Sequence, residues 1–432
     1  MSKCPFDFTR RKFLAFAGGA AVVAGAGVSG LTAAHAGFGG ATADLKQPGL
    51  APQLAAQNTL EPFWGKHQSG IITPAQDYTY FAAFNLATTK RDDVIKLLQK
   101  WTKASAALSR GQTVEPDGET VDSGDTLGLS PSRLTITFGF GPGLFIKDGH
   151  DRFGLKSRRP EALVDLPKFA GDQLVEARTG GDISIQACAD NPQVAFHAVR
   201  QLARMADDIA QIRWTQAGFI ANQPDGGTTR NLLGFKDGTG NPHVDQPAVA
   251  DKFIWVGSEG PDWMRGGSYA VTRRIRIALE HWDKMKVAFQ EQTIGRQKLS
   301  GAPLGLKNET DAVDLNLMDK DGNPAIPENS HIRLATAAAN DGIEILRRSY
   351  AYNDGVSLTA ERWPPWRQGM EYDAGLLFMS YQRDPRTGFI KIFDKMSKFD
   401  MLNQFTTHVG SALFACPAGA KEGGFIGQGL FA

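Results

Sequence analysis

The run Asp182-Ile-Ser-Ile-Gln186 alternates polar and apolar residues, and a segment with helical spacing of its apolar residues follows it over residues 192–210. Strict alternation predicts a strand with one buried face, and the longer period predicts a helix packed on it. Proline at position 192 suits a helix start, where its missing N–H has no partner to lose. The same order of strand and helix precedes it, at residues 78–86 and 92–108.

Further elements on both sides of this unit extend the pattern. Arg133-Leu-Thr-Ile-Thr-Phe138 predicts a strand that ends in a glycine-rich turn over residues 139–143. In the second half, residues 268–279 predict a strand, 281–294 a helix and 375–381 a late strand. Because the β-α-β order occurs twice, the sequence predicts an α+β fold with two related halves, each a sheet with helices on one face.

The composition excludes several classes of protein. The chain has 432 residues, of which 42% are hydrophobic and 22% charged, so a disordered or fibrous protein is excluded. Its net charge of +1 provides no basic field for holding nucleic acid. Three cysteines exclude a disulfide scaffold and any site built from four thiolates.

The N-terminal residues 1–36 have the features of an export signal. Thr9-Arg10-Arg11-Lys12-Phe13-Leu14 leads into a stretch that carries no charged residue up to position 43, and Ala34-His35-Ala36 forms a small-residue cleavage site. The paired arginines are typical of the twin-arginine type, which carries folded proteins with their cofactor to the periplasm. A retained membrane anchor is the alternative interpretation. Residues 37–60 read as a flexible lead-in, and removal of Cys4 would leave Cys188 and Cys416, whose bonding the sequence leaves open.

Gly25-Ala26-Gly27-Val28-Ser29-Gly30 offers a competing interpretation of the same segment. It matches the G-x-G-x-x-G pattern of dinucleotide-binding proteins, with Asp44 near the distance of a ribose-binding acid. An exported flavoprotein is therefore a minor alternative. The glycines at positions 37, 39 and 40 interrupt the helix that this reading requires.

Asn231-Leu-Leu-Gly-Phe-Lys-Asp-Gly-Thr-Gly-Asn-Pro242 is the most unusual run in the chain. Apolar residues lead into Asp237, and glycines after it permit positive φ angles and expose backbone N–H groups. Asp237 is either the cap of a surface turn or a carboxylate held beside a cofactor, able to accept a proton.

Two more segments carry candidate functional groups. Ser330-His-Ile-Arg-Leu-Ala335 places His331 next to a strand-like apolar pair, as a core residue or as an axial iron ligand. Ile345-Leu-Arg-Arg-Ser-Tyr350 places two arginines in succession on a predicted strand, so that they point to opposite faces. A buried arginine requires an anion or a dipole as its partner.

Together, these segments resemble the dye-decolourising (DyP-type) haem peroxidases. Gly234-Phe-Lys-Asp-Gly238 is similar to the G-x-x-D-G motif of that family, residues 330–335 to its proximal histidine segment, and residues 346–350 to its distal arginine segment. Residues 65–71, 181–190 and 294–304 resemble the exported subgroup, which includes the periplasmic peroxidase of the Efe iron-uptake system. The resemblance implies two ferredoxin-like domains of the dimeric α/β-barrel type, at 61–225 and 226–432, the second of which binds haem.

The resemblance also implies roles for individual residues. His331 would ligate the iron of one non-covalent haem b per chain, and Asp237 would lie on the distal side. Arg347 would be the distal partner, with Arg348 as the alternative, and Asn241 would support Asp237. The remaining implied haem contacts are Gly238, Thr239 and Gly240, and the residues Thr336, Ala337 and Ala338, which stand where the family often continues with Asn-Pro. His408 and Cys416 are interpreted as structural.

The function implied is reduction of hydrogen peroxide with oxidation of an organic donor, such as a dye, a phenol or a porphyrinogen. For bulky donors, electrons would pass through Tyr350, Tyr352, Trp363 or Trp366. The alternative implied by the same subgroup is a protein of an iron-uptake system that releases iron from haem. The expected partners are the twin-arginine export machinery, iron-uptake components and a second copy of the chain in a dimer.

Overall fold

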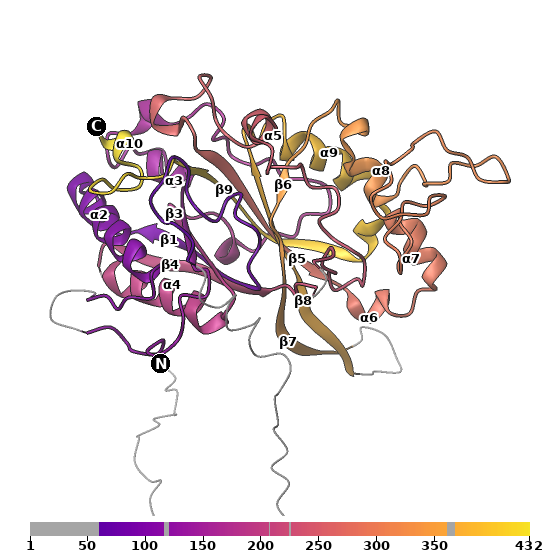
Figure 1. Ribbon diagram of the computed structural model, residues 1–432, viewed down its shortest axis with the longest axis horizontal. Coiled ribbons are helices and arrows are strands. Elements are labelled where there is room, and N and C mark those ends of the chain that lie inside the picture. The colour runs from indigo at the N-terminus through magenta and orange to yellow at the C-terminus, as the bar shows by residue number, and fades with distance from the viewer. Residues whose placement is uncertain (1–59, 116–120, 207, 224–225, 361–367) are drawn as a thin grey trace, which may run out of the picture. The chain divides into compact units, whose positions relative to one another are not determined.

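A nine-stranded antiparallel sheet organises the described part of the chain, in the order β5-β9-β2-β3-β1-β4-β7-β8-β6 (Figure 1). The computed structural model describes residues 60–115, 121–206, 208–223, 226–360 and 368–432. The predicted signal segment 1–36 and all but Leu60 of the lead-in 37–60 lie outside these ranges. The strands are β1 (Tyr78–Leu86), β2 (Thr135–Phe140), β3 (Ile183–Ala189), β4 (Ala210–Phe219), β5 (Ser268–Ile277), β6 (Leu346–Arg347), β7 (Tyr350–Ala360), β8 (Gln368–Gln382) and β9 (Thr406–Cys416).

The sheet closes on itself because β5 pairs with both β9 and β8. Eight strands thereby form a barrel-like sheet, and the short β6 pairs with β8. The strands before and after residue 220 meet at two junctions, where Phe140 pairs with Ala415 and Phe219 with Ala351. The expected antiparallel sheet with helices is therefore present, as one continuous sheet shared by both halves.

Helices cover parts of this sheet. The longest, α2 (Arg91–Leu108) and α4 (Pro192–Ala206), pack on each other, and α4 packs on β1 and β3. The other helices are α3 (Pro142–Phe145), α5 (Pro247–Phe253), α6 (Leu279–Trp282), α7 (Val287–Ile294), α8 (His331–Ala335), α9 (Phe389–Phe399) and α10 (Gln428–Phe431), with 3-10 turns η1 (Lys156–Arg158), η2 (Glu176–Arg178), η3 (Asp262–Met264), η4 (Ala337–Ala339) and η5 (Met401–Gln404). Among the described residues, no helix has both the length and the apolar character that crossing a membrane requires.

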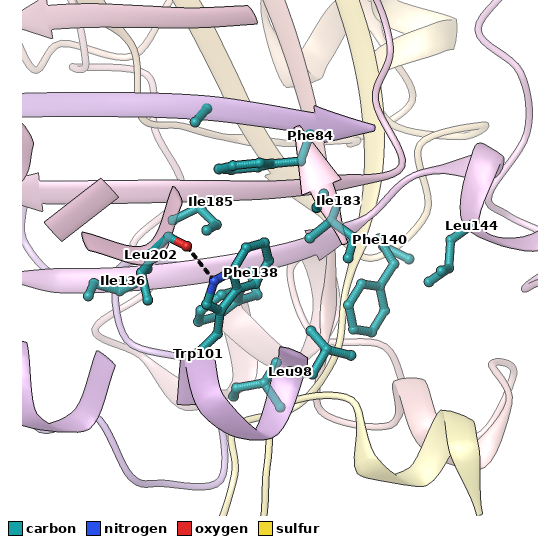
Figure 2. Packing of buried hydrophobic residues seen from close by; sticks show 14 of the residues in the cluster. Phe84, Leu98, Trp101, Ile136, Phe138, Phe140, Leu144, Ile183, Ile185 and Leu202 are labelled. Atoms are coloured by element: carbon teal, nitrogen blue, oxygen red, sulfur yellow. Dashed lines mark hydrogen bonds between the residues drawn. The ribbon is translucent and has the colours of Figure 1, made fainter. Parts of the chain in front are cut away.

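Aromatic packing fixes α2 against the sheet (Figure 2). Trp101 of α2 is fully buried between Phe84 of β1 and Phe138 of β2, with ring centroids 5.3 and 6.0 Å away. Its indole Nε1–H donates a hydrogen bond to the carbonyl oxygen of Leu202 in α4, at 2.7 Å. The polar atom of the largest core side chain is thus satisfied, and it ties the two helices together.

Several predicted boundaries were wrong for identifiable reasons. Strand β2 continues through the expected glycine turn to Phe140, because Gly139 allows a close approach: a Cβ there would lie 2.7 Å from atoms of Phe414 and Ser184. The helix predicted over 281–294 is two helices, because Lys286 adopts an extended conformation between α6 and α7. The predicted helix over 192–210 ends at Ala206, and Ala210 already begins β4.

In the described part of the chain, Cys188 and Cys416 are buried free thiols. They do not form the disulfide that the sequence left open.

Candidate functional site

A cavity of about 340 Å³ lies in the C-terminal half of the described chain. Its wall includes residues from β5, β8, α8 and α9, the run that begins at Asn231, and Arg347 of β6. Helices α8 and α9 pack on each other next to this site (Figure 1). Three separate segments of the chain therefore meet here, and they carry Asp237, His331 and Arg347.

The loop that presents Asp237 is shaped by its own side chains. Asn231 accepts hydrogen bonds from the backbone N–H groups of Leu233 (3.1 Å) and Phe235 (3.4 Å), and its Nδ2 donates to Asp237 Oδ2 at 3.2 Å. The next residue, Gly238, has φ +127°, a conformation that strains any residue with a Cβ. The loop is thus built to hold the carboxylate in one position.

Arg347 forms an ion pair with Asp237, with Nη1 donating to Oδ1 at 2.6 Å. Its backbone is held separately: Asn241 Oδ1 accepts from the Arg347 N–H at 3.0 Å, and Asn241 Nδ2 donates to the Arg347 carbonyl oxygen at 2.8 Å. The expectation that Asn241 supports Asp237 was therefore wrong in its contact. The amide that bonds to Asp237 is that of Asn231, and Asn241 instead ties the loop to the strand of Arg347.

Arg348 points away from the cavity, as the alternation of side chains along a strand requires. It is buried, and its guanidinium donates to the Thr73 carbonyl oxygen and to Gln76 Oε1. Of the two adjacent arginines, only Arg347 reaches the cavity.

His331 lines the cavity at the start of α8, rather than beside a strand as the sequence suggested. Its Nδ1 lies 2.7 Å from Asp400 Oδ2, and the other oxygen of Asp400 accepts from the N–H of Leu402 at 2.8 Å. Burial lowers the pKa of His331, but the charge and hydrogen bond of Asp400 outweigh it, so that the pKa is raised. Arg347, Asp237 and His331 all line the same cavity.

Asp400 and Arg296 are site residues that the sequence did not predict. Asp400 is 69 positions from its histidine and stands in no motif. Arg296 lies within residues 294–304, which resemble the exported subgroup but indicate no role for this arginine. It lines the cavity, and its Nη1 donates hydrogen bonds to the carbonyl oxygens of Gly301 (2.7 Å) and Glu309 (2.9 Å).

A cluster of charged residues supports the loop of residues 236–240. Glu309 pairs with Lys236 and accepts a hydrogen bond from Thr239 Oγ1 at 2.8 Å. Burial raises the pKa of Glu309, and these partners outweigh it and lower the pKa to about 2. Of the other residues expected around a haem, Gly238, Thr239, Gly240, Thr336 and Ala337 line the cavity, whereas Asn241 and Ala338 are not among its lining residues in the described part of the chain.

The chemistry of this cavity fits a haem. Its walls are largely apolar, with side chains such as Ile275, Phe378 and Ile392, as a flat macrocycle requires. His331 has a carboxylate on Nδ1, the arrangement that orients a metal-binding imidazole and leaves Nε2 for the metal. The Arg347–Asp237 ion pair lines the same cavity as His331. A reacting oxygen ligand needs a positive group and a proton acceptor beside it, and these two side chains are of those types. The fold and this cavity define a haem enzyme of the peroxidase class.

Comparison with known proteins identifies the family. Residues 68–220 match the N-terminal model, and residues 228–421 the C-terminal model, of the Dyp-type peroxidases. The chain belongs to the Dyp-type peroxidase family, and it is a haem-dependent peroxidase. The flavoprotein alternative is thereby set aside, and its glycine motif lies outside the described residues.

Individual relatives agree with this assignment. The chain is 40% identical over 378 residues to the dye-decolorizing peroxidase of Thermobifida fusca, covering 84% of this chain and 83% of that one. It is 34% identical over 380 residues to the deferrochelatase of Escherichia coli K12, covering 85% and 86%. Among solved structures, the oxyferrous complex of DtpA from Streptomyces lividans superposes with a TM-score of 0.79 at 38% identity, covering 88% of this chain and 99% of that one.

Proposed function

We propose that this chain reduces hydrogen peroxide at a haem b held by His331, with Asp237 and Arg347 as the residues that act on the peroxide. The observation that carries the proposal is the 2.6 Å ion pair between these two side chains, which faces the same cavity as the histidine. Haem supplies the iron that binds peroxide and accepts its oxidising equivalents. The protein must supply proton transfer and charge stabilisation.

Asp237 would accept a proton from a peroxide bound in this cavity. Its Oδ2 is held by Asn231 and its Oδ1 by Arg347, so the carboxylate needs no rearrangement before it acts. The Arg347 guanidinium provides positive charge where negative charge develops on the departing oxygen. Because Asn241 holds the Arg347 backbone, the guanidinium is directed from a fixed strand.

The remaining site residues hold the cofactor. The Asp400 carboxylate accepts the His331 Nδ1 proton, which keeps Nε2 free as the iron ligand. The backbone of residues 238–240 and the Thr336–Ala337 turn line the cavity and would contact the macrocycle, and Arg296 would offer a positive charge to a carboxylate of the cofactor.

The donor is an organic molecule of the dye, phenol or porphyrinogen type, and bulky donors would deliver electrons through aromatic residues. Tyr350 and Tyr352 are fully buried, which suits an internal relay, while Trp363 and Trp366 lie outside the described residues. The Arg274 guanidinium lies over the Tyr352 ring, 4.1 Å from its centroid, and its charge only partly offsets burial, which raises the pKa of Tyr352.

A second candidate function is release of iron from haem. It is supported by the 34% identity to proteins named deferrochelatase, which extends over 87% of this chain for several of them. Product analysis distinguishes the two functions. Incubation with haem, peroxide and an organic donor yields intact porphyrin and free iron in one case, and oxidised donor with retained haem in the other.

The cellular setting is part of the proposal. We propose that residues 1–36 direct export by the twin-arginine machinery, that the mature chain acts in the periplasm beside iron-uptake components, and that it forms a homodimer. Residues 61–225 and 226–432 would be two related ferredoxin-like domains, which is supported by the two family segments at 68–220 and 228–421.

An absorption spectrum of the purified protein is the first test. A Soret band in the wild type and its loss in His331→Ala are expected. Normal haem content in His331→Ala would overturn the ligand assignment, and a flavin-type spectrum would overturn the proposal as a whole.

A further inference from the structure

His408 lies on β9 and lines the haem cavity, at a point to which the proposed function assigns no role. Its ring packs against Phe393 of α9, with centroids 4.6 Å apart, and its strand partner is Ile275 of β5. Both neighbours line the cavity too. A polar ring thus lies in the cavity wall next to the apolar side chains of Ile275 and Phe393.

Arg273 fixes the protonation of this ring. The Arg273 side chain is fully buried, pairs with Asp172 through Nη2 and donates to Ser411 Oγ at 2.9 Å through Nη1. Its Nε–H donates to His408 Nδ1 at 3.0 Å. Since Nδ1 accepts this bond, it carries no proton, and the proton of the neutral ring must be on Nε2. Burial and the charge of Arg273 hold the pKa of His408 well below its usual value, so the ring stays neutral.

The Nε2–H group has no partner in the part of the chain that the structure describes. Nδ1 makes the only hydrogen bond of the ring within these residues, and Nε2 is not among the fully enclosed side-chain atoms. Since the ring is otherwise surrounded by protein and lines the cavity, its accessible N–H opens into that space.

We infer that His408 donates a hydrogen bond from Nε2–H to a carboxylate of the bound haem. The carboxylates are the only strong acceptors on the periphery of haem b, since its other substituents are hydrocarbon. His408 is then a cofactor-binding residue, and the chain Asp172–Arg273–His408 is the buried support that orients it. This inference rests on the proposed haem site, and it adds His408 as the hydrogen-bond partner of one haem carboxylate.

The test measures haem loss from the full-length holoprotein to excess apomyoglobin. His408→Phe should lose haem about tenfold faster than the wild type, since one charge-assisted hydrogen bond is removed. His408→Gln should stay within about threefold of the wild type, because its Oε1 can accept from Arg273 while its Nε2 donates to the cofactor. His281→Phe, at an exposed histidine outside the cavity lining, is the matched control and should show the wild-type rate.

The same proteins are then reconstituted with iron etioporphyrin, which carries alkyl groups in place of both carboxylates. The difference between wild type and His408→Phe should disappear. An equal difference with both cofactors would assign His408 a purely structural role, and no difference with either would show that it does not contact the haem. Either result overturns the inference while leaving the His331 assignment intact, because that assignment is tested separately by the Soret band of His331→Ala.

Discussion

The carboxylate of Asp400 decides which nitrogen of His331 carries a proton, so replacing it by asparagine should weaken haem binding. In the wild type, one oxygen of Asp400 faces His331 Nδ1 at 2.7 Å and the other accepts from the Leu402 N–H at 2.8 Å. Asparagine has only one oxygen. If that oxygen keeps the bond to Leu402, the amide NH₂ faces Nδ1, which must then accept, and the proton moves to Nε2.

A protonated Nε2 cannot ligate iron. The opposite orientation of the amide keeps the tautomer but places NH₂ against the Leu402 N–H, at a cost of about 1 kcal/mol for the lost cap. Loss of the partner of a metal-binding histidine typically lowers metal affinity about 10- to 100-fold, or about 1.4–2.7 kcal/mol. We expect Asp400→Asn to lose haem to apomyoglobin faster by a factor in this range.

The matched control is Asp394→Asn, which removes an exposed carboxylate of α9 whose one ion-pair partner among the described residues is Lys398. It should behave as the wild type. A thermal melt of each apoprotein separates a loss of haem affinity from a loss of folding. If Asp400→Asn retains haem at the wild-type rate with an unchanged Soret band, the role assigned to the His331–Asp400 pair is refuted.

Three further predictions follow from the same contacts. Arg347→Ala should retain haem, and its rate with peroxide, measured by stopped flow, should fall about 100- to 1,000-fold, because a preorganised charge is removed while Asn241 still holds the backbone. An unchanged rate would refute the role of Arg347 in charge stabilisation. Asp237→Asn should lower the rate with peroxide less than Arg347→Ala does, and the loss should be most evident at low pH, where hydroxide is too scarce to act as the base. A pH–rate profile parallel to that of the wild type would contradict proton transfer by Asp237. Glu309→Gln should lower the melting temperature at neutral pH, and the difference should shrink as pH falls from about 5 towards 2. The reason is that a carboxyl group whose pKa is lowered by folding stabilises the folded state above its unfolded-state pKa and loses this contribution when it is protonated. A difference in melting temperature that does not change with pH would argue against the Lys236–Glu309 pair as the cause.

Strands are where prediction from sequence was both most and least successful. The alternation in residues 182–186 predicted β3, and the apolar run from position 268 predicted β5. Strand β7 was not predicted: Asn353, Asp354 and Gly355 are residue types that favour turns, and they lie at an irregularity within the strand. Strand β9 was missed because its first residues are polar, and Thr406 and His408 are polar because they face a cavity.

The sequence by itself determined the local chemistry of this protein. Three motifs placed a carboxylate directly before a glycine-rich turn, a histidine next to an apolar pair and two arginines on opposite faces of one strand, and each depends only on neighbours along the chain. Only the tertiary structure decided which arginine meets Asp237, that Asp400 orients His331, and that Asn231 and Asn241 divide the support of the distal pair. These pairs, apart from that of Asn231, join residues 69 to 110 positions apart. Their meeting depends on how the sheet closes and the helices pack, which no local pattern encodes.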